Sequence, residues 1–237
     1  MPHPCLQYLL IILLAAPASL IAETSLPPLL PQRPFAAGEV LRYRIRVGPL
    51  TVGTATLEIM GPRTVAGRSA FEVRALTRSR ALISSLYPVR DRIVSWTDTE
   101  DYRCHRLFRR IREGSYREAG DWTVDHSRGE ADDGRGMRVT LPPGSHDVFS
   151  ALLRLRASHL ATGDQVLVPV LLGGAASWLQ IEVGAERDVE VPAGRYRCLV
   201  LRPALGGAEP FRPCPLRLST PRPSSSPTAR KTLRTLR

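Results

Sequence analysis

The sequence predicts a mainly β protein: a curved antiparallel sheet, or half-open barrel, with one amphipathic helix packed on it. Apolar and polar residues alternate through most of the chain between residues 35 and 203, which is typical of strands buried on one face. Turns containing Gly and Pro separate these segments, as in a meander of sequential strands. One later segment departs from the alternation and has the apolar spacing of a helix.

The first strand illustrates the pattern. Leu41, Tyr43 and Ile45 alternate with arginines, so one face of this strand is apolar and the other is strongly basic. By the same reasoning, strands are expected at residues 41–47, 55–59, 71–75, 92–97, 103–112, 121–126, 137–141, 165–171, 177–183, 187–191 and 195–201. The segment 81–87 is apolar but irregular, and predicts a short helix or a loop.

The helix is expected over residues 147–160. Leu152 and Leu155 fall on one face of it, and Arg154 falls opposite them. Ser145 or Asp147 can cap its N-terminus, because each offers a side-chain oxygen to the unpaired backbone N–H groups of the first turn.

The N-terminal residues 1–22 predict a cleaved secretory signal. Residues 6–14 form an apolar core followed by small residues, with cleavage expected after Ala18 or Ala22. A transmembrane helix is the alternative, but the apolar run is short and contains Pro17, so no membrane span is expected after cleavage. The expected location is the periplasm or cell envelope. Residues 23–34 are rich in proline and predict an extended linker before a β-rich domain at residues 35–203.

Residues 204–237 predict a disordered basic tail. This part of the chain is rich in proline and shows no alternation, so it is not expected to form the centre of a sheet. Two explanations stay open: a shifted reading frame near Pro203, or a natural basic extension that binds an anionic surface.

The net charge is +11, and nearly all of the basic residues are arginines. Arginine suits phosphate, acidic glycans or anionic lipids, although a GC-rich coding bias also explains the excess. No stacking-aromatic motif or recognition helix accompanies the charge, so nucleic-acid binding is not expected. Cys104 and Cys198 lie in expected strands and could form a disulfide or stay as two buried thiols.

Several short motifs occur in a fixed order along the chain. They read FAAGEVLRY at 35–43, GTA at 53–55, YPVRD at 87–91, DVFSALLRLR at 147–156 and VPAGRYRC at 191–198. Together they resemble an uncharacterised bacterial envelope family, the domain of unknown function 3108, over residues 35–203. The resemblance implies an exported protein of unknown activity on a curved antiparallel sheet, and no catalytic residue. It also implies further strands after Pro203, which the proline-rich sequence there does not provide.

Candidate chemistry is sparse. The histidines have no metal-ligand spacing, and neither a nucleophile elbow nor a phosphate-binding loop is present, so no catalytic, metal or cofactor site is predicted. The functional hypothesis is a polar site at one mouth of the sheet. The structural alternative is that the same residues cap the helix and form ion pairs. The members of this site are Arg90, Asp91, Asp147, Arg154 and Arg156.

The favoured function is a non-catalytic binding or carrier module for an apolar or glycan ligand. The concave face would hold the ligand, and the residues expected to line it or fill the core are Tyr43, Phe71, Trp96 and Trp178. A structural or assembly component that contacts other envelope proteins is the alternative, and an envelope enzyme is less favoured.

Overall fold

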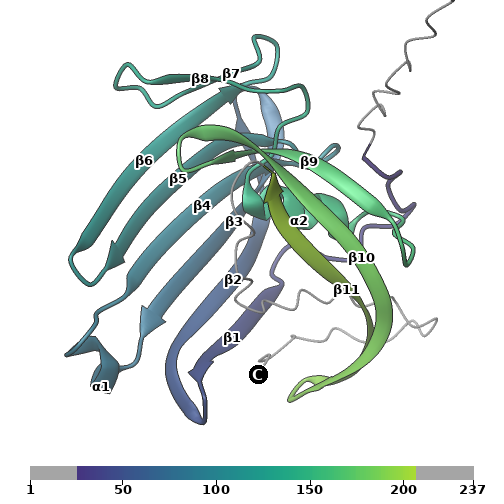
Figure 1. Ribbon diagram of the computed structural model, residues 1–237. Helices are drawn as coiled ribbons and strands as arrows, with labels where there is room; N and C mark the ends of the chain where they lie inside the picture. Colours follow the sequence, from purple (N-terminus) through teal and green to yellow (C-terminus); the bar gives the residue numbers. More distant parts are fainter. Residues whose placement is uncertain (1–25, 207–237) are drawn as a thin grey trace, which may run out of the picture.

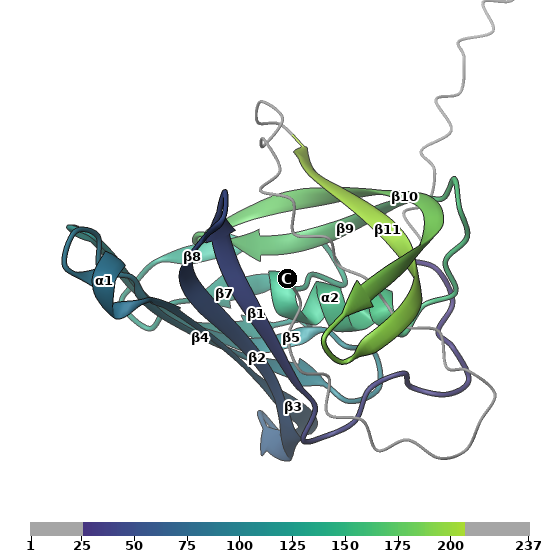
Figure 2. The ribbon, with the colours of Figure 1, turned by 90° about the horizontal axis from the view of Figure 1, so that it is seen from below.

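The computed structural model describes residues 26–206, which form two antiparallel sheets with a helix between them (Figures 1 and 2). The predicted signal at residues 1–22 and most of the predicted tail, residues 207–237, lie outside the described residues. Residues 204–206 of that tail belong to a strand. A mainly β fold with one helix packed on a curved antiparallel sheet is therefore confirmed, and the sheet is open rather than closed into a barrel.

The large sheet is a meander in which each strand pairs antiparallel with the next along the chain (Figure 1). This order follows from the short turns between alternating segments. Its strands are β1 (Val40–Val47), β2 (Leu50–Val65), β3 (Arg68–Ser79), β4 (Arg90–Asp98), β5 (Cys104–Glu113), β6 (Tyr116–Asp125), β7 (Glu130–Asp132) and β8 (Arg138–Thr140). The short helix α1 (Ala81–Ser84) lies between β3 and β4, in the segment expected to be a helix or loop.

The small sheet has the order β11–β10–β9. Its strands are β9 (Gln165–Leu172), β10 (Ala175–Val191) and β11 (Gly194–Gly206). The two segments expected at 177–183 and 187–191 form one long strand, because the register shifts between Val183 and Glu186 without breaking the pairing. Strand β11 continues past Pro203, which an edge strand tolerates because one side of its backbone needs no ladder donor.

Helix α2 (Val148–Arg156) lies between the two sheets (Figure 2). On one side, Leu153 packs against the large sheet in a cluster that includes Ile59 and Phe71. On the other side, Ala151 and Leu155 pack against the small sheet. The helix therefore buries side chains on two faces, although its sequence spacing predicted one.

The extended segment that begins at Leu26 pairs with the chain just beyond α2. The Leu30 N–H donates to Ala157 O at 2.7 Å, and the His159 N–H donates to Pro28 O at 2.9 Å. These bonds engage the backbone after Arg156, which explains why the helix ends there and not at residue 160. The part of the predicted linker that the structure describes is extended, but it is attached to the helix.

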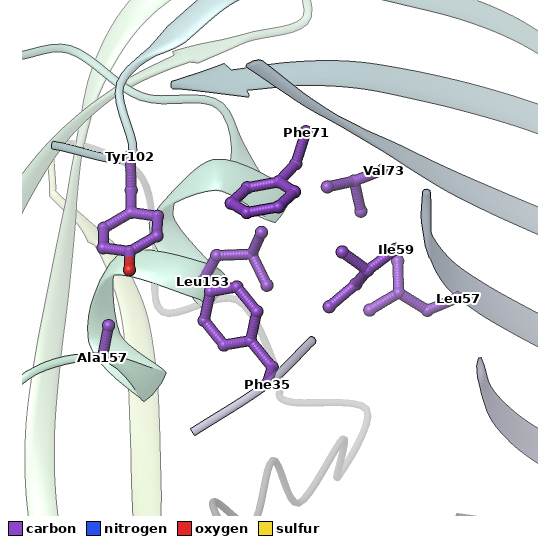
Figure 3. Packing of buried hydrophobic residues seen from close by; sticks show 8 residues of the cluster. All are labelled: Phe35, Leu57, Ile59, Phe71, Val73, Tyr102, Leu153 and Ala157. Atoms are coloured by element: carbon purple, nitrogen blue, oxygen red, sulfur yellow. The ribbon is translucent and has the colours of Figure 1, made fainter. Parts of the chain in front are cut away.

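The central core surrounds Leu153 (Figure 3). The Phe35 ring makes edge-on contacts with Phe71 and Tyr102, with ring centroids 6.1 and 5.7 Å apart. The buried members of the cluster are Phe35, Leu57, Ile59, Phe71, Val73, Tyr102, Leu153 and Ala157. Two strands, the N-terminal segment, the β4–β5 turn and the helix therefore share one core.

Replacing Leu153 with Ala should lower the free energy of unfolding by about 3–4 kcal/mol, because the side chain is fully buried and its loss leaves a cavity in this core. Leu82→Ala is the matched control: Leu82 is 76% exposed, so the change should stay within about 0.5 kcal/mol. Urea denaturation of both variants measures the difference. Equal losses would contradict the packing of α2 against the large sheet.

Candidate functional site

Asp147 joins helix α2 to strand β4. Its Oδ1 accepts hydrogen bonds from the backbone N–H groups of Phe149 and Ser150 at 2.8 and 3.4 Å, which is the predicted N-cap. Its Oδ2 accepts a hydrogen bond at 2.5 Å from Ser95 Oγ of β4, a residue that lies far away in the sequence. The carboxyl group is fully buried, so it can only act on groups inside the protein.

A small polar group surrounds this carboxyl. Ser95 Oγ also lies 3.0 Å from Thr97 Oγ1, and the buried Cys104 is close to both Asp147 and Ser95. Burial raises the pKa of the Cys104 thiol well above its ordinary value, and the nearby Asp147 charge raises it further. Because a protonated thiol is a poor nucleophile, Cys104 is chemically inert here. It is a free thiol, so the disulfide considered with Cys198 is not formed.

His146 fixes the chain just before the helix. Its backbone N–H donates to Pro169 O at 2.9 Å and its carbonyl accepts from the Leu171 N–H at 2.7 Å, which ties it to β9. The Nδ1–H donates to Tyr102 O at 2.9 Å. Burial lowers the pKa of His146 to about 4, so the ring is neutral near neutral pH.

Arg154 and Arg156 lie at the other end of α2 and are both buried. Arg154 donates to Ser158 Oγ and, at 2.5 Å, to Pro27 O, so it holds the N-terminal segment against the helix. Arg156 Nη2 donates to Glu39 Oε1 at 2.7 Å, and its guanidinium carbon lies 5.2 Å from the centre of the Phe35 ring. Its Nη1 is buried and has no hydrogen-bond partner among residues 26–206.

Arg90 and Asp91 lie elsewhere, at the start of β4. Asp91 Oδ1 accepts a hydrogen bond from the Arg112 N–H at 2.9 Å, and Arg90 is exposed opposite Arg78. Asp91 precedes Ser95 by four residues, which is about 13 Å along a strand. The five residues of the predicted polar site therefore occupy three separate places: one end of β4 and the two ends of α2.

A second buried carboxyl, Asp98 at the end of β4, had no signal in the sequence. It accepts hydrogen bonds from Arg68 Nε at 2.6 Å, His105 Nε2 at 2.8 Å and the Glu100 N–H at 2.8 Å. Burial raises the pKa of Asp98, but these donors outweigh it and hold the pKa well below its ordinary value. Asp98 and its donors fix the β4–β5 turn.

Among residues 26–206, no cluster of His, Cys, Asp and Glu could hold a metal ion.

The inner face of the large sheet carries an apolar surface that α2 leaves partly uncovered. Tyr43 lies opposite Ala55, and Leu41 lies in the neighbouring row with Ala75 and Ile93. All five side chains are partly exposed, and Phe149 and Leu152 of α2 border them at the core cluster. We call this surface the inner strip, and it consists of Leu41, Tyr43, Ala55, Ala75 and Ile93.

Four aromatic residues were expected to line or fill the concave side, but they are distributed over both the inner and the outer faces of the sheets. Tyr43 belongs to the inner strip and Phe71 to the core. Trp96 lies on the outer face, where the Arg106 guanidinium is 5.1 Å from its ring centre, so this part of the expectation is wrong. Trp178 precedes Leu179, which packs on the α2 side of β10, and alternation places Trp178 on the opposite face.

The comparisons agree with the motifs found in the sequence. A family model described as protein of unknown function (DUF3108) matches residues 42–212. The chain belongs to this family. No curated protein and no solved structure matches the chain. Membership of DUF3108 therefore confirms the resemblance, and the family description assigns no activity.

Removing the Asp147 side chain tests the link between α2 and β4. Asp147→Ala should lower the free energy of unfolding by about 3 kcal/mol, because it removes the cap and leaves the buried Ser95 hydroxyl without its acceptor. Asp147→Ser keeps a capping oxygen but is too short to reach Ser95, so about half of this loss is expected. Chemical denaturation distinguishes the two variants, and an Ala variant as stable as the natural protein would contradict the assignment.

The buried His146 predicts a pH-dependent stability. Its folded pKa of about 4 lies below the ordinary value of 6.5, so between these values the unfolded chain binds a proton that the folded chain does not. Stability is therefore fully present above about pH 6.5 and falls as the pH approaches 4, by about 2–3 kcal/mol. His146→Gln should flatten this slope in denaturation curves. His126, whose pKa burial also lowers, leaves a smaller slope of the same sign. An unchanged slope would count against the neutral His146.

Proposed function

We propose that the protein is a non-catalytic binding or carrier module of the cell envelope, and that its ligand has an apolar chain. The observation that carries the proposal is the inner strip. Contact of apolar side chains with water on the concave side of a sheet is unfavourable, and an apolar ligand would remove that contact. The export signal predicted at residues 1–22 supports a location in the periplasm or envelope.

Arg156 supports a ligand that also has an acidic group. It lies next to the strip: burial raises the pKa of Tyr43, and the charge of the nearby Arg156 opposes this rise. The Nη1 of Arg156 is a buried donor without an acceptor among the described residues, which is costly for a guanidinium. A carboxylate or phosphate oxygen that entered beside Glu39 and Tyr43 would give this donor a partner. A fatty acid or another acidic lipid has both features.

The two other functions have less support. An assembly component would contact other envelope proteins through an exposed surface, and the inner strip would then have no role. An enzyme would need its polar groups within reach of a substrate, but Asp147, Ser95, Thr97 and Asp98 are each at most 1% exposed. Between residues 26 and 206, no helix is long and apolar enough to cross a bilayer.

The strip is tested by adjacent substitutions on opposite faces of β2. Ala55→Asp places a charge on the strip and should weaken binding of cis-parinaric acid at least tenfold, because the carboxylate would have to lose its water when the chain binds. Thr56→Asp adds the same charge on the outer face and should change the affinity less than about twofold. Fluorescence titration measures both variants.

Native mass spectrometry of the protein purified from the periplasm provides an independent test. A bound acidic lipid is expected in the natural protein and should be lost in Ala55→Asp. Persistent absence of any ligand would contradict carriage. Equal binding of the probe by both variants would contradict the location on the strip while leaving carriage itself in place.

A further inference from the structure

The outer face of the large sheet carries arginines in two adjacent rows. Leu41 and Tyr43 point to the inner face, so alternation directs Arg42 and Arg44 to the outer one. Strand pairing then continues the rows: Arg42 lies in line with Arg92 and Arg110, and Arg44 lies in line with Arg78 and Arg90. Arg112 faces Arg117 on the next strand pair. The arginine belt consists of Arg42, Arg44, Arg78, Arg90, Arg92, Arg110, Arg112 and Arg117, all of them exposed.

Within the part of the chain that the structure describes, no acidic side chain is paired with the belt. The other members of its rows are Thr54, Thr56, Leu76 and Ala119. Within residues 26–206, none of the eight arginines forms an ion pair, whereas arginines elsewhere do so repeatedly: Arg74 with Glu72, Arg106 with Asp121, Arg138 with Asp132, Arg195 with Glu190, Arg197 with Glu186 and Arg202 with Glu182. A coding bias towards arginine explains the number of arginines but not this segregation.

The belt works against the stability of the fold. Arg78 lies directly opposite Arg90, and Arg92 lies directly opposite Arg110. Like charges that face each other across strands destabilise a sheet. An arrangement that costs stability and repeats across three strand pairs is expected where it serves an interaction.

Exposed apolar side chains occur at the same end of the sheet. Leu82 and Leu86 are 76% and 84% exposed on and just after α1, between Arg78 and Arg90 of the belt. Tyr87 follows them, and the Gly114 N–H donates to Pro88 O at 2.9 Å, so this segment contacts the β5–β6 turn. Val47 and Leu50 are exposed at the β1–β2 turn. Figure 1 shows α1 and the β1–β2 turn along one edge of the large sheet, its lower left.

We propose that this edge docks on the surface of an anionic lipid bilayer. The arginines would contact headgroup phosphates, which guanidinium groups bind in bidentate fashion. Leu82, Leu86 and Tyr87 would enter the boundary between headgroups and acyl chains. A soluble polyanion would satisfy the arginines but would leave the leucines in water, so the combination favours a bilayer. This docking does not depend on the ligand proposed for the inner strip.

Vesicle binding of the full chain tests the proposal. Cosedimentation with mixed phosphatidylglycerol–phosphatidylcholine vesicles is expected, and pure phosphatidylcholine vesicles should bind far less. The triple variant R78Q/R90Q/R92Q should lower the partition coefficient by about 100-fold, since each arginine at an anionic surface contributes about fivefold. Its thermal stability should be retained or raised, because the substitutions relieve repulsion.

The matched control is R187Q/R195Q/R197Q, which removes the same charge from exposed arginines of the small sheet. It should reduce binding by less than about fivefold. Equal losses in the two triple variants would mean that total charge accounts for binding. No loss in either would mean that the basic residues after Gly206 account for it. Either result would overturn the proposal.

L82S/L86S should reduce vesicle binding about tenfold and leave heparin binding unchanged. If this variant binds vesicles as the natural chain does, the surface recognises polyanions and not a bilayer.

Discussion

Helix α2 must bury apolar side chains on two sides, and the rest of the structure depends on this requirement. A helix of nine residues is not stable by itself in water, so its existence depends on the surfaces that cover it. Leu153 completes the core of the large sheet, and Leu155 completes that of the small sheet. The helix covers much of both inner faces, and elsewhere Leu171 of β9 packs directly on Leu107 and Trp122 of the large sheet. The two sheets and the helix therefore form one interdependent unit.

Buried polar groups hold the helix at both ends. At its start, the bond between Asp147 and Ser95 fixes the helix to the middle of β4. At its end, Arg154 binds the N-terminal segment and Arg156 binds Glu39, just before β1. These groups are buried and bonded within the protein, so each would cost free energy if its partner were lost. This explains why polar residues in the helix motif are structural as well as candidates for ligand contact.

The sequence was sufficient to predict the strands but not which distant residues meet. Alternation predicted every described strand except the short β7, because a face that packs on a core leaves a period of two in the sequence. The bounds were less accurate, since β2, β3 and β6 extend several residues beyond the predicted segments. It also predicted the Asp147 cap, which is a local feature. Contacts such as Ser95 with Asp147 and Asp98 with His105 depend on how the sheet curves and how its turn closes, and local patterns carry no information on either. The same limit explains Trp96: its aromatic character suggested the concave side, while the register of β4 directs it outward.

The arginines show that one residue type can have two opposite roles in the same fold. Arg154 and Arg156 lie within the protein, where a guanidinium needs several bonded partners. The belt arginines lie on the surface, where water replaces such partners and repulsion between neighbours is tolerated at modest cost. Composition alone suggested a common cause for all of them. Their surroundings separate the two groups, since strand register decides which arginines face acids and which face one another.

The belt and the inner strip lie on opposite faces of the same strands, one residue apart. Tyr43 of the strip lies between Arg42 and Arg44 of the belt, and Thr77, in line with Tyr43, precedes Arg78. Adjacent residues rise by about 3.4 Å along a strand and point to opposite faces, so the row of Tyr43 and the row of Arg44 lie at the same end of the sheet, on its two faces. An acyl chain that left the bilayer there would cross a short polar boundary before it reached apolar side chains. Docking would thus shorten the path through water, which is the main barrier to transfer of an apolar chain. A sheet with a basic outer face and an apolar inner face needs no separate domain to bring the two together.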